Sequence, residues 1–130
     1  MTKWLISKTK GKTTWRLVTF PGPNGGESVG IVDLVAIRKN HATPKVGLKR
    51  GDLFEIILIQ VKGGTSAWPS VDDANRLRRV ARHYRAKEIL LAEWKKGRQP
   101  RIYRMRRILP HNASARNLWR EVDSIATLFR

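Results

Sequence analysis

Three polar side chains lie in or beside apolar runs, where a charge or an amide is costly. Asp33 interrupts the apolar run 31–37, and Gln60 and Lys62 lie near the end of a second run, 53–64. A carboxylate in such surroundings needs a cation or several hydrogen-bond donors. One solution is an ion pair between Asp33 and Lys62; another is a divalent cation bound by the oxygens, with the ammonium group acting on water. The spacing alone leaves both open.

The two apolar runs have the composition of buried β-strands. Each is rich in β-branched residues and is bounded by glycine, charged residues or proline. The intervening segment 40–51 suits the long tip of an antiparallel hairpin. The sequence therefore predicts two paired strands.

Pairing of these strands brings the three polar residues to one place. If Arg38 lies opposite the first residues of the second run, Asp33 lies opposite one of residues 58–60. Residues two positions apart on a strand share a face, so Gln60 and Lys62 point the same way. We therefore expect the three side chains to meet at one end of a buried hairpin.

The two segments 30–36 and 59–64 resemble the PD-(D/E)XK nuclease superfamily, and are similar in particular to archaeal Holliday-junction resolvases and related small nucleases. In that superfamily an Asp on one strand and an acid-X-Lys on the next bind magnesium and cut DNA. By position, Asp33 matches the motif Asp, Gln60 the second acid and Lys62 the motif Lys.

The resemblance covers roughly residues 25–105 and has implications for fold and chemistry. It implies an α/β, restriction-endonuclease-like domain with a central mixed β-sheet flanked by helices. It also implies a deoxyribonuclease that uses Mg²⁺, with Mn²⁺ as a substitute. Asp33 and Gln60 would hold the cation together with the Val61 carbonyl, and Lys62 would position or deprotonate the attacking water.

Two positions depart from the superfamily pattern. Val32 stands where a proline usually precedes the Asp, and Gln60 removes one negative charge from the metal site. An amide oxygen binds magnesium less strongly than a carboxylate. Many members carry a further metal-binding Glu on a first helix, and Glu27 is the one acid available for that role, with a surface loop carboxylate as its alternative. The competing hypothesis is a degenerate relative that binds DNA without cleaving it.

The composition indicates a polyanionic partner. The chain has 27 Lys and Arg against 10 Asp and Glu, a formal net charge of +17, which favours nucleic acid. A membrane surface is the weaker option, because no long apolar span or secretory signal is present. Cysteine is absent, which excludes disulfides and Cys-based zinc sites. We expect a cytoplasmic, DNA-directed protein, and a homodimer is left open.

We expect the 130 residues to form a single nuclease-like domain. Residues 1–20 read as an N-terminal hairpin with strands at 4–6 and 15–20. The core would span 29–106 and end in an edge strand at 101–106, after a buried strand at 88–94. A C-terminal helix is expected over 112–129 from the apolar spacing.

Basic residues gather on one predicted helix and in the hairpin loop. Ser70 and Asp73 predict the start of a helix. We expect Arg76, Arg79 and Arg82 on this helix, and Lys45 and Lys49 in the loop, to contact phosphates. A solvated charged face is the alternative reading, but arginines without compensating acids repel one another.

Overall fold

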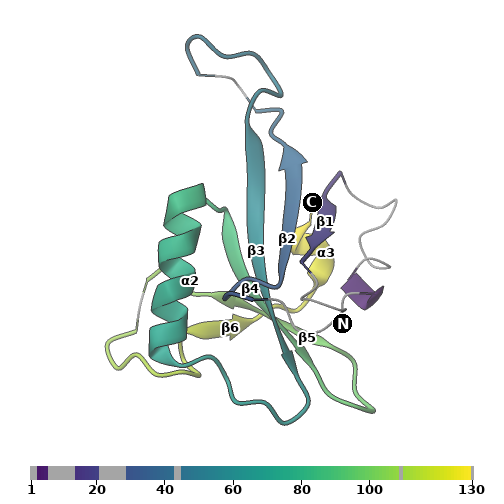
Figure 1. Ribbon diagram of the computed structural model, residues 1–130, viewed down its shortest axis with the longest axis vertical. Helices are drawn as coiled ribbons and strands as arrows, with labels where there is room; N and C mark the ends of the chain where they lie inside the picture. Colours follow the sequence, from purple (N-terminus) through teal and green to yellow (C-terminus); the bar gives the residue numbers. More distant parts are fainter. Residues whose placement is uncertain (1–2, 6–13, 21–28, 43–44, 109, 130) are drawn as a thin grey trace.

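The computed structural model describes residues 3–5, 14–20, 29–42, 45–108 and 110–129. Six strands form one sheet in the order β1-β2-β3-β4-β5-β6. All neighbouring pairs are antiparallel except β3 and β4, which are parallel. The predicted α/β class with a mixed central sheet is therefore confirmed (Figure 1). The elements are β1 (Arg16–Thr19), β2 (Leu34–Lys39), β3 (Phe54–Gly63), α2 (Val71–Tyr84), β4 (Glu88–Trp94), β5 (Arg101–Met105), β6 (Trp119–Glu121) and α3 (Ile125–Leu128).

The β2–β3 hairpin has the predicted register. Arg38 lies opposite Glu55, and Leu34 lies opposite Ile59. Continuing this alignment by one residue places Asp33 opposite Gln60, and the Asp33 N–H donates to the Ile59 carbonyl at 3.0 Å. Strand β2 begins three residues later than expected, so Asp33 immediately precedes it.

Helix α2 carries the chain from β3 to β4, which is what a parallel pair requires. It begins with the expected capping box: Ser70 accepts from the Asp73 N–H, and the Asp73 carboxylate accepts from the Ser70 N–H. Its apolar side buries Ala74 and Leu77 against Leu91 and further residues of β5 and β6. The helix therefore covers one face of the sheet (Figure 1).

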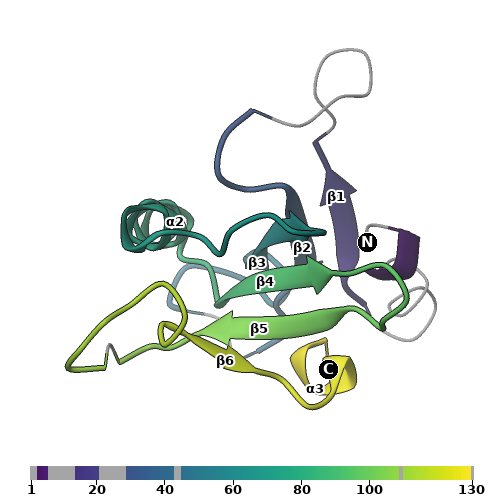
Figure 2. The ribbon, with the colours of Figure 1, turned by 90° about the horizontal axis from the view of Figure 1, so that it is seen from below.

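The opposite face is closed by segments from both ends of the chain (Figure 2). Leu5 and Trp15 pack there with Leu128 and Phe129 over the aliphatic side chains of β2, β3 and β4. The rings of Trp15 and Phe129 meet edge to face with centroids 6.1 Å apart. This second layer leaves the central strands buried on both faces.

The expected N-terminal hairpin is wrong in its first strand. Residues 3–5 are helical, and residues 6–13 lie outside the described part of the chain. One helical turn lets Leu5 enter the core, at 1% exposure, while Lys3 stays in solvent. The second expected strand exists as β1, and it pairs with β2.

The expected C-terminal helix over 112–129 is also wrong. Ser114 and Asn117 cap one another reciprocally, but the structure makes only one turn there before β6. Trp119 then pairs with Met105, so β5 is not the edge strand that the sequence predicted. Pairing with β6 satisfies backbone N–H and C=O groups of β5 that would otherwise be open at the edge of the sheet.

Candidate active site

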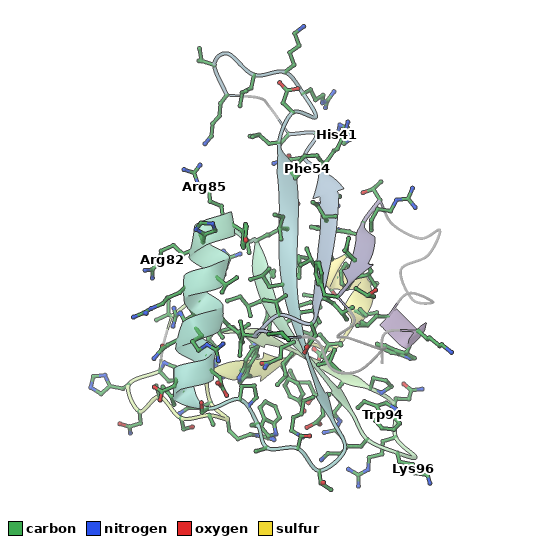
Figure 3. All side chains as sticks on the ribbon, in the orientation of Figure 1. His41, Phe54, Arg82, Arg85, Trp94 and Lys96 are labelled. Carbon is green, nitrogen blue, oxygen red and sulfur yellow. The ribbon has the colours of Figure 1, made fainter. Side chains whose placement is uncertain are left out.

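Asp33, Gln60 and Lys62 lie on the α2 face of the sheet, toward the carboxyl end of β3. Gln60 and Lys62 alternate with Val61, which packs on the opposite face. In Figure 3 this end of the sheet is the one that carries the labelled Trp94, the residue opposite Gly63. The register, continued by one residue, places Asp33 opposite Gln60, with Lys62 two residues further along β3. That the three side chains meet at one site stays a prediction.

The carboxylate of Asp33 is oriented by the backbone of β3. Its Oδ2 accepts a hydrogen bond from the Val61 N–H at 2.7 Å. A main-chain N–H donated to a carboxylate oxygen holds that carboxylate in one position. The Val61 carbonyl was expected as a metal ligand, whereas the contact that the structure records uses the Val61 N–H.

Gln60 contributes an oxygen that the described protein atoms leave unsatisfied. Its Oε1 is buried and accepts no hydrogen bond from any described residue. A buried amide oxygen without a donor is costly, so such an atom calls for a donor or a cation. Oxygen ligands of this kind are those that Mg²⁺ prefers.

Lys62 forms its ion pair with a residue that the sequence analysis did not assign to the site. Its Nζ lies 3.5 Å from Oε2 of Glu93 on β4, and the two side chains are 6% and 5% exposed. The parallel register places these residues side by side. The alternative expectation was an ion pair between Asp33 and Lys62. Among the described residues, Lys62 pairs with Glu93 instead.

Glu93 carries the second unsatisfied oxygen of this region. Its Oε2 is buried and takes part in no hydrogen bond with a described residue, since the contact with Lys62 has the length of an ion pair only. The signal that singled out Asp33, an acid within an apolar run, was also present at Glu93. Its proximity to Lys62 depended on the neighbouring strands and their alignment, which only the structure supplies.

Arg101 lies opposite Glu93 on β5 but has other partners. Its Nε is 3.8 Å from Oε1 of Glu121, and its side chain is 54% exposed. The hydrogen bond to Tyr103 and then the charge of Glu121 raise the pKa of the Arg101 guanidinium. Lys62 is therefore the buried cation beside Glu93, and Arg101 is a solvated one.

The oxygen atoms at the site are of the kind that bind divalent cations, but they carry little negative charge. No group of three or more His, Asp or Glu side chains suited to a metal occurs within the described ranges. What the site offers instead is the Asp33 carboxylate and the unsatisfied Gln60 oxygen, both hard oxygen ligands. These two residues would hold Mg²⁺ or Mn²⁺.

The remaining acids of the sequence analysis lie elsewhere. Glu27 lies outside the described residues. Glu55 pairs with Arg38 at 3.1 Å and with Lys87 at 3.4 Å. Asp52 accepts from the Lys49 N–H at the hairpin tip. Neither joins the three central residues.

The predicted phosphate-binding residues are exposed but divided between two places. Lys45 and Lys49 lie at the tip of the β2–β3 hairpin, which projects beyond the rest of the molecule (Figure 1). Arg76, Arg79 and Arg82 are exposed on α2, and Arg76 lies 3.8 Å from Asp73. The structure does not gather these five residues into one patch.

A cationic hollow of about 360 Å³ lies between the end of α2 and the start of β4. Arg82, labelled in Figure 3, lines it together with Arg78, Arg106 and Arg107. The Nη1 atom of Arg78 is buried there and donates no hydrogen bond to a described residue. Glu88 also lines the hollow and lies 3.6 Å from Arg107, so the arginines outnumber the acid there.

No described helix is long and apolar enough to cross a membrane.

Comparison with known proteins yields a structural likeness and no sequence match. No family model matches the chain, and no curated protein matches it. The structure is similar to that of Hjc, a Holliday junction resolvase from the archaeal hyperthermophile Archaeoglobus fulgidus, with a TM-score of 0.44 and 16% identity, covering 78% of this chain and 74% of that chain. At this identity the likeness says nothing about the chemistry of the site.

Proposed function

We propose that this protein is a metal-dependent endonuclease that hydrolyses DNA phosphodiester bonds with Mg²⁺, or Mn²⁺ in its place. One observation carries the proposal: a carboxylate held just before β2, a buried amide oxygen that no described residue donates to, and a buried ammonium group two residues further along β3. The net charge of +17 supports a polyanionic substrate. The resemblance of residues 30–36 and 59–64 to the PD-(D/E)XK superfamily supports the same chemistry.

Each of the three residues has a role that follows from its surroundings. Asp33, oriented by the Val61 N–H, and Gln60 would hold the cation. The bound cation would supply the positive charge that stabilises the transition-state phosphate. Lys62, an ammonium group paired with Glu93, would position the attacking water by donating a hydrogen bond to it, and its burial limits the directions in which it can point.

The competing function is DNA binding without cleavage. Two observations favour it: the second motif position is an amide, and Lys62 is engaged by Glu93. Both functions predict binding that weakens steeply with salt, so salt dependence does not separate them.

Cleavage of a DNA panel in the presence and absence of Mg²⁺ or Mn²⁺ tests the proposal. The panel contains linear, nicked, flap and four-way-junction DNA, because the likeness to a Holliday junction resolvase makes a junction a natural member. Asp33→Asn keeps an oxygen that can accept the Val61 N–H but removes the charge, so we expect cleavage to fall about a thousandfold or more. Asp52→Asn, at the hairpin tip, is the matched control and should cleave normally.

Either of two results would contradict the proposed endonuclease function. A wild-type protein that binds every DNA of the panel but cuts none with either metal supports the binding-only function. Cleavage that persists in Asp33→Asn would remove the assigned site.

A further inference from the structure

Glu93 is the most buried acidic side chain beside the proposed site, at 5% exposure, and the proposed function gives it no task. It lies opposite Lys62 in the parallel β3–β4 pair, with Nζ and Oε2 3.5 Å apart. A buried ion pair of this kind is seldom a net source of stability, since desolvating two charges costs as much as their attraction returns. The gain in folding stability alone therefore does not account for this pair.

The charge of the site offers a further explanation for the pair. Gln60 is neutral, so the ammonium group of Lys62 would offset the negative charge that Asp33 presents to a divalent cation. Lys62 is two residues from Gln60 on the same face, a separation of roughly 6–7 Å along the strand, so its buried charge would repel a cation held by Gln60 and Asp33. Glu93 neutralises Lys62 and restores one net negative charge to the group.

We propose that Glu93 supplies, from the neighbouring strand, the negative charge that position 60 lacks, and that it does so as a positioning residue that neutralises and holds Lys62. The inference rests on the proposed function, because it concerns the same cation site. It goes beyond the proposed function because it assigns a negative charge needed for cation binding to Glu93 on β4, which lies outside the two motif segments.

Moving the charge back to β3 is the sharpest test. Mn²⁺ binding is measured by titration calorimetry, with thermal unfolding as a check on folding. Glu93→Gln should weaken Mn²⁺ binding by about tenfold or more, since it removes one charge close to a divalent ion. The double variant Gln60→Glu/Glu93→Gln keeps the total charge and should bind Mn²⁺ within about threefold of wild type. It should also recover the DNA cleavage that the single variant loses.

Glu88→Gln is the matched control. Glu88 is also buried on β4, at 8% exposure, but it is paired with Arg104 and Arg107 at the other end of the strand. This variant should bind Mn²⁺ as wild type does, because the lost charge is about 17 Å of strand away from Glu93.

A second pair of variants tests the charge of Glu93 in the absence of the ammonium group. Lys62→Met and Lys62→Met/Glu93→Leu both lack the ammonium group, and the double variant replaces the whole ion pair by apolar side chains, a change that is often neutral for stability. The proposal predicts that Lys62→Met binds Mn²⁺ about tenfold or more tightly than the double variant. Equal affinities would overturn it.

The outcomes separate this inference from the proposed function. If the wild type binds Mn²⁺ and cleaves DNA, and Glu93→Gln binds Mn²⁺ equally well, Glu93 is a structural partner only and the proposed function stands. If the wild type neither binds Mn²⁺ nor cleaves DNA, the proposed function fails and the inference fails with it.

Discussion

Strand β4 carries two buried glutamates whose surroundings differ, Glu88 at its start and Glu93 near its end. Glu88 accepts a hydrogen bond from Arg104 and lies 3.6 Å from Arg107. These arginines are 43% and 77% exposed, so water also solvates the cations. Glu93 faces an ammonium group that is 6% exposed, and its Oε2 has no hydrogen-bond partner among the described residues.

The difference teaches how to read a buried carboxylate. At Glu88, bonding to solvated arginines satisfies the charge, and the arrangement ties β4 to β5 and to the segment after β5. At Glu93, two buried charges meet without a hydrogen bond at Oε2, which is costly for folding alone. We interpret the first as a stabilising contact and the second as part of a site.

The largest effect should come from replacing the buried pair as a unit. Lys62→Met/Glu93→Leu removes both charges together, so the free energy of unfolding should stay within about 1 kcal/mol of wild type or rise. DNA cleavage should fall by about a thousandfold or more, equivalent to about 4 kcal/mol, because the ammonium group is gone. Denaturant unfolding and single-turnover cleavage measure the two effects. Cleavage at the wild-type rate would show that the pair belongs to the fold, as Glu88 does.

The single substitution at Glu93 should lower the free energy of unfolding more than the single substitution at Glu88. Glu93→Gln leaves Lys62 buried and unpaired, with an expected loss of about 3 kcal/mol in the free energy of unfolding. Glu88→Gln leaves two arginines that can turn to water, so we expect a loss of about 1 kcal/mol. Urea unfolding of both variants gives the comparison. A larger loss at Glu88 would contradict our distinction between the two ends of the strand.

The smallest effect concerns the cationic hollow at the Glu88 end. Arg82→Ala should weaken DNA binding by about 1 kcal/mol and reduce the slope of log affinity against log salt by about one, as expected for one lost phosphate contact. Asp33→Asn, at the other end, removes no cation and should not reduce that slope. Fluorescence anisotropy over a salt series measures both. An unchanged slope in Arg82→Ala would remove the hollow from the DNA-binding surface.

The central part of the fold was predictable because its signals are local. Strands β3 and β4 are apolar runs with clear ends, and the Ser70–Asp73 capping box begins α2. Aligning Arg38 with the start of β3 predicted Asp33 opposite one of residues 58–60, and the register places it opposite Gln60. The ends of the chain were not predictable in this way, because the three-residue β6 exists only through its pairing with β5.

The residues of the site also fall into a group that was predictable from local sequence and one that was not. Asp33, Gln60 and Lys62 were recognisable from one hairpin and its spacing. The proximity of Glu93 to Lys62 was not, because it depends on β4 returning parallel to β3 after a helix and on the alignment that results. The roles of Asp33, Gln60 and Lys62 in cleavage, and of Glu93 in positioning Lys62, are predictions that the variants above test.

Mapping Mn²⁺ onto the protein by amide NMR tests the central claim most directly. Substoichiometric Mn²⁺ broadens the signals of nuclei close to the ion, and the Val61 N–H is hydrogen-bonded to the Asp33 carboxylate. We predict that the amide signals of Val61 and Lys62 broaden first in the wild type, that those of Glu88 persist, and that Asp33→Asn removes the effect. Broadening that begins elsewhere, or that is unchanged in Asp33→Asn, would contradict a cation site at the end of the β2–β3 hairpin.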